Sequence, residues 1–185
     1  HGHHPEWEGN TVAQLAQKLE LTPVDAVLYI LYQCDAGVAC IYFCIDKNDM
    51  FCIMRDMHVA VGSDGYSFTY DRSITTTVPH PRSFGTFPRF LRLVREQRLM
   101  PLEDAVYKLT GLPAQILGLK DRGVLKEGAM ADLTVFDPDS VADQSEYTDS
   151  VKQPLGIPYV LVGGTAAIWK GSATGSRTGG VLIRE

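Results

Sequence analysis

The chain has 185 residues, of which 45% are hydrophobic and 21% charged, so it is long enough for one domain with a buried core. Its net charge is −5 and its pI about 5.5, and the basic residues form no stripe, which argues against a nucleic-acid partner. No apolar run approaches the ~20 residues of a membrane span, and the N-terminus lacks a signal-peptide pattern, so we expect a cytoplasmic protein.

The first four residues, His-Gly-His-His, contain three histidines. Such a cluster can bind metal, but it is typical of the remnant of an expression tag. We therefore leave residues 1–4 out of the fold prediction.

Two capped helices are predicted near the N-terminus. Asn10 and Thr11 precede residues 12–21, in which apolar side chains recur at helical spacing. Thr22 is the expected N-cap of a second helix, with Pro23 in its first position.

A strand, a short helix and a second strand are predicted next. Residues 38–45 are β-branched and aromatic, residues 46–56 form a helix with Asp46 as its cap, and residues 58–65 begin as an apolar strand. Helices and strands thus alternate, which predicts parallel βα units and an α/β fold.

The four cysteines lie in this same region and include no C-x-x-C pair, so a structural zinc site is a weak interpretation. Their apolar surroundings predict buried free thiols in a reducing cytoplasm. They are Cys34, Cys40, Cys44 and Cys52.

Residues 66–83 are rich in Thr, Ser, Pro and Asp and are too many for a tight turn. Long loops of this kind are usually functional or disordered, and we hypothesise a lid or wall of a site. Two helices are predicted after the loop, over residues 86–99 and 100–119, the second with Pro101 in its first position.

Beyond Gly118 the pattern changes to β-structure. Residues 123–141 predict a short strand, a turn and a strong strand at Asp132–Phe136. Residues 159–171 predict a hairpin that turns at two glycines, and residues 178–185 can add one more strand. Residues 119–185 are therefore expected to form antiparallel β-structure.

Asp64 follows the apolar run Val59–Val61 and lies between Gly62 and Gly65. An Asp before a Gly is most often a turn residue or a helix cap. At the carboxyl end of a barrel strand, however, a carboxylate can bind metal or take a proton from water. Ser63 has no histidine at a triad spacing, which argues against a serine hydrolase.

Two further side chains near this acid have more than one interpretation. His80 is expected to organise the Pro79–Arg82 turn rather than to contact a substrate. Arg89 is either a helix-surface charge or the partner of an internal acid, and the sequence leaves both open.

Three stretches, "VGSDG" at 61–65, "HPRSFGTFPRFL" at 80–91 and residues 102–137, occur in this order. Together they resemble the N-acyl-D-amino-acid deacylases, or D-aminoacylases, of the amidohydrolase superfamily. Residues 4–17 and 159–164 are similar to that family as well, so the resemblance covers most of the chain.

The resemblance implies a zinc-dependent hydrolase that splits an N-acyl-D-amino acid into a D-amino acid and a carboxylic acid. It implies a metal-binding (β/α)8 barrel with a small β-sandwich built from both chain ends. Asp64 matches the family's aspartate, which lies in the metal site and acts as general base and then as general acid. Arg82 matches the arginine that contacts the substrate carboxylate, a group that a guanidinium binds with two parallel hydrogen bonds.

The family's other metal ligands, an H-x-H pair, a Cys or Glu and two later histidines, do not occur here in context. Family members are also much longer. The resemblance therefore implies a C-terminal portion, with residues 5–118 as the last βα units and residues 119–185 as sandwich strands. We expect zinc in the intact enzyme, and no complete zinc site or activity in this chain alone, because catalytic zinc needs about three protein ligands.

Two alternatives remain open. The chain could be a non-catalytic domain that binds another copy, or a missing N-terminal part, across an open barrel edge. It could also come from a sibling amidohydrolase that acts on a cyclic amide, such as a hydantoinase or dihydroorotase. That alternative does not account for the motif at residues 80–89.

Overall fold

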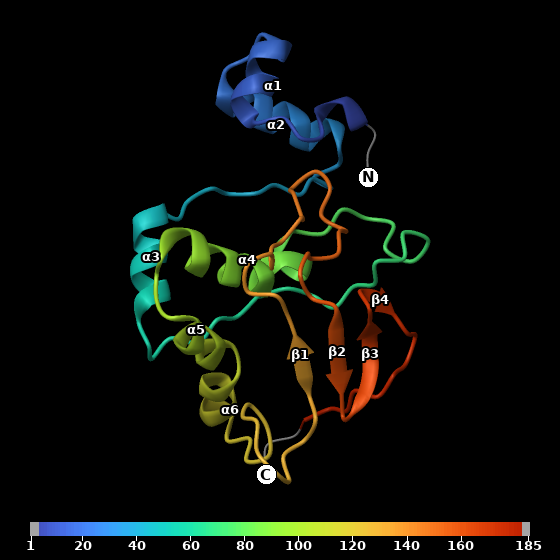
Figure 1. Ribbon diagram of the computed structural model, residues 1–185. Coiled ribbons are helices and arrows are strands. Elements are labelled where there is room, and N and C mark those ends of the chain that lie inside the picture. The colour runs from blue at the N-terminus through green and yellow to red at the C-terminus, as the bar shows by residue number, and fades with distance from the viewer. Residues whose placement is uncertain (1–3, 183–185) are drawn as a thin grey trace.

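The computed structural model describes residues 4–182, and its architecture is a mixture of helices and one sheet (Figure 1). All helices precede all strands along the described chain. The helical elements are a 3-10 turn at Pro5–Trp7, α1 (Val12–Leu19), α2 (Pro23–Gln33), α3 (Lys47–Arg55), α4 (Arg82–Gln97), α5 (Leu102–Leu109) and α6 (Gly111–Leu117). The strands are β1 (Leu133–Val135), β2 (Tyr159–Val162), β3 (Thr165–Trp169) and β4 (Ser172–Ala173).

The two predicted N-terminal helices are confirmed, caps included. The Thr11 hydroxyl accepts the Gln14 backbone N–H while the Gln14 side chain accepts the N–H of Thr11, which is a capping box. The Thr22 hydroxyl caps α2 by accepting the Asp25 backbone N–H at 3.2 Å, with Pro23 in the first helical position. α1 packs against α2, and the pair stands apart from the remaining elements (Figure 1).

The core lies where α3, α4 and α5 meet the chain that follows β1. α4 contributes three of its buried side chains, each worth about 1.5–3 kcal/mol when removed from water. The core consists of Phe51, Phe90, Leu91, Val94, Leu99, Ala105 and Val141.

The four strands form one antiparallel sheet in the order β1-β2-β3-β4. Gly163 and Gly164 connect β2 to β3 and both have positive φ, as a two-residue hairpin turn requires. This predicted hairpin and the strand within Asp132–Phe136 are confirmed. Lys170 and Gly171 form a second turn with positive φ, which leads into β4.

The predicted strands at residues 38–45 and 58–65 are wrong for the chain as described, because both segments are irregular. A strand is held by its partner, and between residues 4 and 182 no segment forms a ladder with either run. For the same reason no parallel βα pairing exists in the described chain, where every ladder is antiparallel.

Three smaller boundaries also differ from the prediction. α4 begins at Arg82 rather than near Thr86, so Pro88 lies inside the helix instead of in its first turn. The helix predicted over 100–119 breaks at Thr110 into α5 and α6, with Pro101 as the N-cap of α5. Residues 123–128 form no strand.

The chain ends lie partly outside the structure. The histidines at positions 1 and 3 and the end of the strand predicted over 178–185 fall outside the described residues, and residues 178–182 are irregular. Between residues 4 and 182, no helix combines the length and apolar character that crossing a bilayer requires.

The cysteine prediction was half right. All four thiols are free, but three are exposed and Cys34 is half-buried. Cys40 and Cys44 lie in the unpaired segment 38–45, which has no sheet to cover it.

Candidate active site

Asp64 and Arg82, the two residues singled out from the sequence, lie together in the structure. The Asp64 Oδ2 atom is 3.1 Å from Arg82 Nη1. The Asp64 side chain is 88% exposed and that of Arg82 is 42% exposed, so both remain open to solvent. An exposed pair of this kind contributes only about 0–1 kcal/mol to stability, which leaves the carboxylate available to other partners.

The backbone around Asp64 is tightly constrained. Asp64 itself has φ of 47°, in the left-handed region that a non-glycine residue rarely adopts. A Cβ atom at Gly65 would lie 2.9 Å from the Cα atom of Ser83. Gly65 is therefore needed for the close approach of this turn to the start of α4, and the Ser83 hydroxyl accepts the Tyr66 N–H at 3.3 Å.

His80 shapes the turn that leads into α4. Its Nδ1 atom accepts the Arg82 backbone N–H at 3.1 Å, which requires the neutral imidazole with its proton on Nε2. Partial burial, and then the charges of Arg82 and Arg89, lower the pKa of His80 and favour that neutral form. The geometry is the one expected of a histidine that organises the turn.

Aromatic rings hold the surrounding loops in place. The His80 ring meets the edge of Tyr147 with centroids 5.4 Å apart, and Tyr147 in turn meets Phe43 at 5.2 Å. In the loop at 66–83, Phe68 and Tyr70 pack on Phe84 of α4. The long loop is thus anchored next to Asp64 and Arg82.

A second charged cluster lies along α4, and the sequence did not predict its acid. Asp143 is only 5% exposed and is contacted by Arg89 Nε at 3.2 Å and Arg92 Nε at 2.9 Å. Burial lowers the pKa of Arg92, but the hydrogen bond and charge of Asp143 and then Glu96 outweigh it, so the net shift is upward. Arg89 is therefore the partner of an internal acid.

The sequence contained one indirect signal of this cluster. A Cβ atom at Gly85 would lie 3.0 Å from Cβ of Asp143, so the glycine gives the acid room against the helix. Asp143 has no motif of its own, and the Arg92 contact spans 51 residues of sequence.

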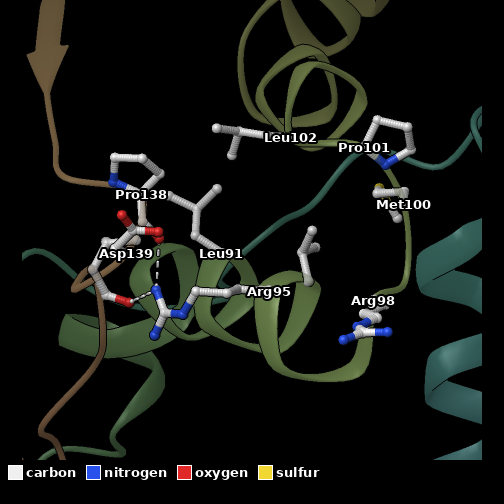
Figure 2. Close-up of a pocket in the computed structure, with 10 residues that line it drawn as sticks. Leu91, Arg95, Arg98, Met100, Pro101, Leu102, Pro138 and Asp139 are labelled. Atoms are coloured by element: carbon white, nitrogen blue, oxygen red, sulfur yellow. Dashed lines mark hydrogen bonds between the residues drawn. The ribbon is translucent and has the colours of Figure 1, made fainter.

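The other end of α4 borders a cavity of about 500 Å³, which holds neither Asp64 nor Arg82 (Figure 2). Arg95 crosses its wall, with Nη1 donating to the carbonyl oxygens of Pro138 at 2.8 Å and Val141 at 2.9 Å. These bonds tie α4 to the chain after β1, and the cavity wall is otherwise mainly apolar.

A zinc site cannot be assembled from the described residues. Between residues 4 and 182 no three His, Cys, Asp or Glu side chains are close enough to share a metal ion. Asp64 is paired with a cation instead, while His58 is almost fully exposed and bonded to Asp56. The residues present do not fit a catalytic zinc ion by themselves, because such an ion takes about three protein ligands.

Comparison with known proteins reveals relatives over nearly the whole chain. N-acyl-D-glutamate deacylase and D-aminoacylase of Alcaligenes xylosoxydans xylosoxydans are each 39% identical to it over 183 and 182 residues. These matches cover 98% and 97% of this chain but 35% of either relative, so the chain spans about a third of their length. A dihydroorotase of Geotalea daltonii matches only 53 residues, 29% of the chain.

Solved structures resemble the fold as well. N-acyl-D-glutamate deacylase from Bordetella bronchiseptica, complexed with zinc and a phosphonate inhibitor, aligns with a TM-score of 0.72 and 39% identity. The alignment covers 89% of this chain and 32% of that one. A D-aminoacylase with a binuclear metal centre aligns with a TM-score of 0.75 and 36% identity, over 94% of this chain and 34% of that one.

A profile of the amidohydrolase family matches residues 53–167, a span that contains Asp64, Arg82 and the buried Asp143. This span is more than half of the chain, and the similarity to N-acyl-D-amino-acid deacylases extends beyond it in both directions. The chain belongs to the amidohydrolase family.

Proposed function

We propose that this chain is the C-terminal portion of a zinc-dependent deacylase that hydrolyses N-acyl-D-amino acids to a D-amino acid and a carboxylic acid. The observation that carries the proposal is the 3.1 Å contact of Asp64 with Arg82 at an exposed, tightly held turn. A general base and a carboxylate-binding cation lie side by side there, which is what hydrolysis of an acylated amino acid needs.

Each of the two side chains has a separate role. Arg82 binds the carboxylate of the substrate through its guanidinium donors, of which the contact with Asp64 occupies only one nitrogen. Asp64 takes a proton from the attacking water as the new C–O bond forms, and returns it to the amide nitrogen as the C–N bond breaks. A carboxylate held at hydrogen-bond distance from both groups can carry out the two proton transfers.

The substrate class is supported by the relatives that cover nearly all of the chain, which are named for N-acyl-D-glutamate, N-acyl-D-aspartate and D-amino acids in general. A cyclic-amide substrate has weaker support, since the dihydroorotase match covers 29% of the chain and 12% of that relative.

The other residues of the active site would come from the rest of a longer protein. Zinc, when bound, supplies an activated water in such hydrolases. Most of its ligands would come from outside this chain, with Asp64 as the local contributor. The unpaired runs at 38–45 and 58–65 would become strands of a (β/α)8 barrel once they have partners, so that residues 5–118 complete the barrel. Residues 119–185 would form part of a β-sandwich.

Exposed apolar side chains favour a second candidate, an association module. Tyr42, Phe43 and Ile45 are 82%, 76% and 76% exposed in a segment without a sheet partner. Such a patch favours pairing with another copy or with a separate N-terminal part.

The two candidates are separated by assays on the full-length gene product and on the 185-residue chain. We expect the full-length protein to hydrolyse N-acetyl-D-amino acids faster than their L-enantiomers, dihydroorotate or hydantoins. Turnover confined to the cyclic amides would contradict the deacylase proposal. Stable oligomers of the 185-residue chain, measured by sedimentation without residues 1–4, together with an inactive full-length protein would favour the association module.

Arg82→Ala in the full-length protein tests the assigned substrate contact. Loss of a charge-assisted hydrogen bond should raise KM about 10- to 100-fold. Arg55→Ala, which removes an exposed arginine of α3, is the matched control and should leave KM unchanged. An Arg82→Ala enzyme with normal KM would contradict the role.

A further inference from the structure

Lys108 of α5 is the only lysine among residues 4–182 whose side chain is completely buried. An ammonium group in such a place loses its hydration, which is unfavourable unless polar groups replace the water. Burial lowers the pKa of Lys108, opposed in part by the charge of Asp56. A leucine or methionine side chain would fill the same space without burying a charge, so packing alone does not explain a lysine at this position.

The partner of the buried ammonium is a backbone atom rather than an acid. Lys108 Nζ donates to the carbonyl oxygen of Asp56, across 52 residues of sequence. The Asp56 carboxylate accepts the His58 N–H at 2.9 Å, so the residue that Lys108 binds also caps the turn that follows it.

Lys108 contacts the same segment a second time through its main chain. The Val61 N–H donates to the Lys108 carbonyl oxygen at 3.4 Å, a long bond. Side chain and backbone of one residue thus reach Asp56 and Val61, the two ends of a run that has no strand partner in the described chain.

This run leads directly to Asp64, three residues beyond Val61. On the far side of Asp64, the Ser83 hydroxyl accepts the Tyr66 N–H, and Gly65 packs on the backbone of α4. The backbone on either side of Asp64 is therefore fixed, on one side to α5 through Lys108 and on the other to the start of α4. If either attachment is lost, the carboxylate can move relative to Arg82.

We infer that Lys108 is a positioning residue for Asp64, which holds residues 56–61 against α5 so that the carboxylate is presented at a fixed place. The inference rests on the proposed deacylase function, in which Asp64 transfers the proton. A base that is displaced by about 1 Å can lose roughly 10²-fold in rate while the substrate still binds.

The test is Lys108→Met in the full-length protein, since methionine keeps an unbranched side chain that is one atom shorter and lacks the ammonium donor. We expect kcat to fall at least tenfold with KM within twofold of wild type. The melting temperature should not fall, because the buried charge is removed together with its bond. In hydrogen exchange, the Val61 amide should lose at least tenfold of its protection.

Lys126→Met is the matched control. Lys126 Nζ also donates to a backbone carbonyl, that of Lys120, but at the exposed surface. We expect kcat, KM and Val61 exchange of this variant to equal those of wild type.

A Lys108→Met enzyme whose kcat stays within twofold of wild type would overturn the inference. So would a result in which Lys108→Met and Lys108→Gln both lose kcat and melting temperature in parallel. If the Met variant does not fold, hydrogen exchange of the wild-type protein tests the inference instead. The Val61 amide must then be at least tenfold more protected from exchange than the Gly62 amide, and equal protection of the two amides overturns the inference. If wild type hydrolyses no N-acyl-D-amino acid, the proposed function fails, while protected Val61 exchange still supports the attachment itself.

Discussion

Alanine at Gly65 should destabilise the protein, whereas alanine at Gly62, three residues earlier, should not. A Cβ atom at Gly65 would meet the backbone of the neighbouring turn at 2.9 Å from Cα and 3.2 Å from N of Ser83, and 3.3 Å from the Arg82 carbonyl oxygen. Relaxed carbon–carbon contacts are about 3.5–4.0 Å, so the turn and α4 must separate by about 0.6 Å or more. Overpacking of this kind costs about 1–3 kcal/mol.

Gly62 provides the internal control for this prediction. No atom lies within 4 Å of a Cβ atom placed there, and its φ is not positive. Gly62→Ala should therefore lie within about 0.5 kcal/mol of wild type, or gain up to ~1 kcal/mol through a stiffer unfolded chain.

Urea denaturation of the two variants measures the difference. Gly65→Ala should lower the midpoint with an unchanged m-value, and thermal unfolding should show a fall of about 2–4 °C for each kcal/mol lost. Equal midpoints for Gly65→Ala and wild type would refute the close approach of Gly65 to α4. A larger loss for Gly62→Ala than for Gly65→Ala would reverse the proposed packing.

Two further predictions concern the charged groups along α4. Asp143→Ala should destabilise the protein by about 1–3 kcal/mol, because it removes the buried acid that Arg89 and Arg92 share and leaves Arg92 with Glu96 alone. A double-mutant cycle with Arg92→Ala in urea should show a less than additive loss, and strict additivity would contradict the pairing. His80 is expected to make the stability of the fold depend on pH. Its pKa is lowered on folding, first by burial and then by the charges of nearby arginines. The stability that neutral His80 contributes is therefore present above the pKa of the unfolded chain, about 6.5, and is lost as pH falls through the lower pKa of the folded state. His80→Asn should flatten the loss of stability as pH falls below about 6.5, and an unchanged profile for this variant would rule out His80 as the source.

Sequence reasoning worked where the signal is local. Thr11 and Thr22 cap helices because their hydroxyls reach a backbone N–H three residues on, a contact that the sequence spacing already specifies. The hairpin at Gly163 and Gly164 is local in the same sense. The turn at Lys170 and Gly171 was missed, although a glycine before a short polar run was a visible signal.

Sequence reasoning failed where a structure depends on distant partners. The aromatic run at 38–45 has strand propensity, but propensity forms no ladder without a neighbouring strand. The Asp143 cluster joins residues about 50 positions apart, and no spacing rule connects them. Asp64 and Arg82 were predicted from a resemblance rather than from spacing, and their 3.1 Å contact is a property that only the fold could reveal.

The central claim is that Asp64 transfers the proton in hydrolysis of N-acyl-D-amino acids, and one measurement tests it most directly. Turnover of an N-acetyl-D-amino acid by the full-length gene product is compared for wild type, Asp64→Asn and the control Asp49→Asn, an exposed aspartate in the first turn of α3. Loss of a general acid–base group predicts a fall in kcat of about 10²- to 10⁴-fold for Asp64→Asn and no change for the control. Normal turnover by Asp64→Asn would contradict the account.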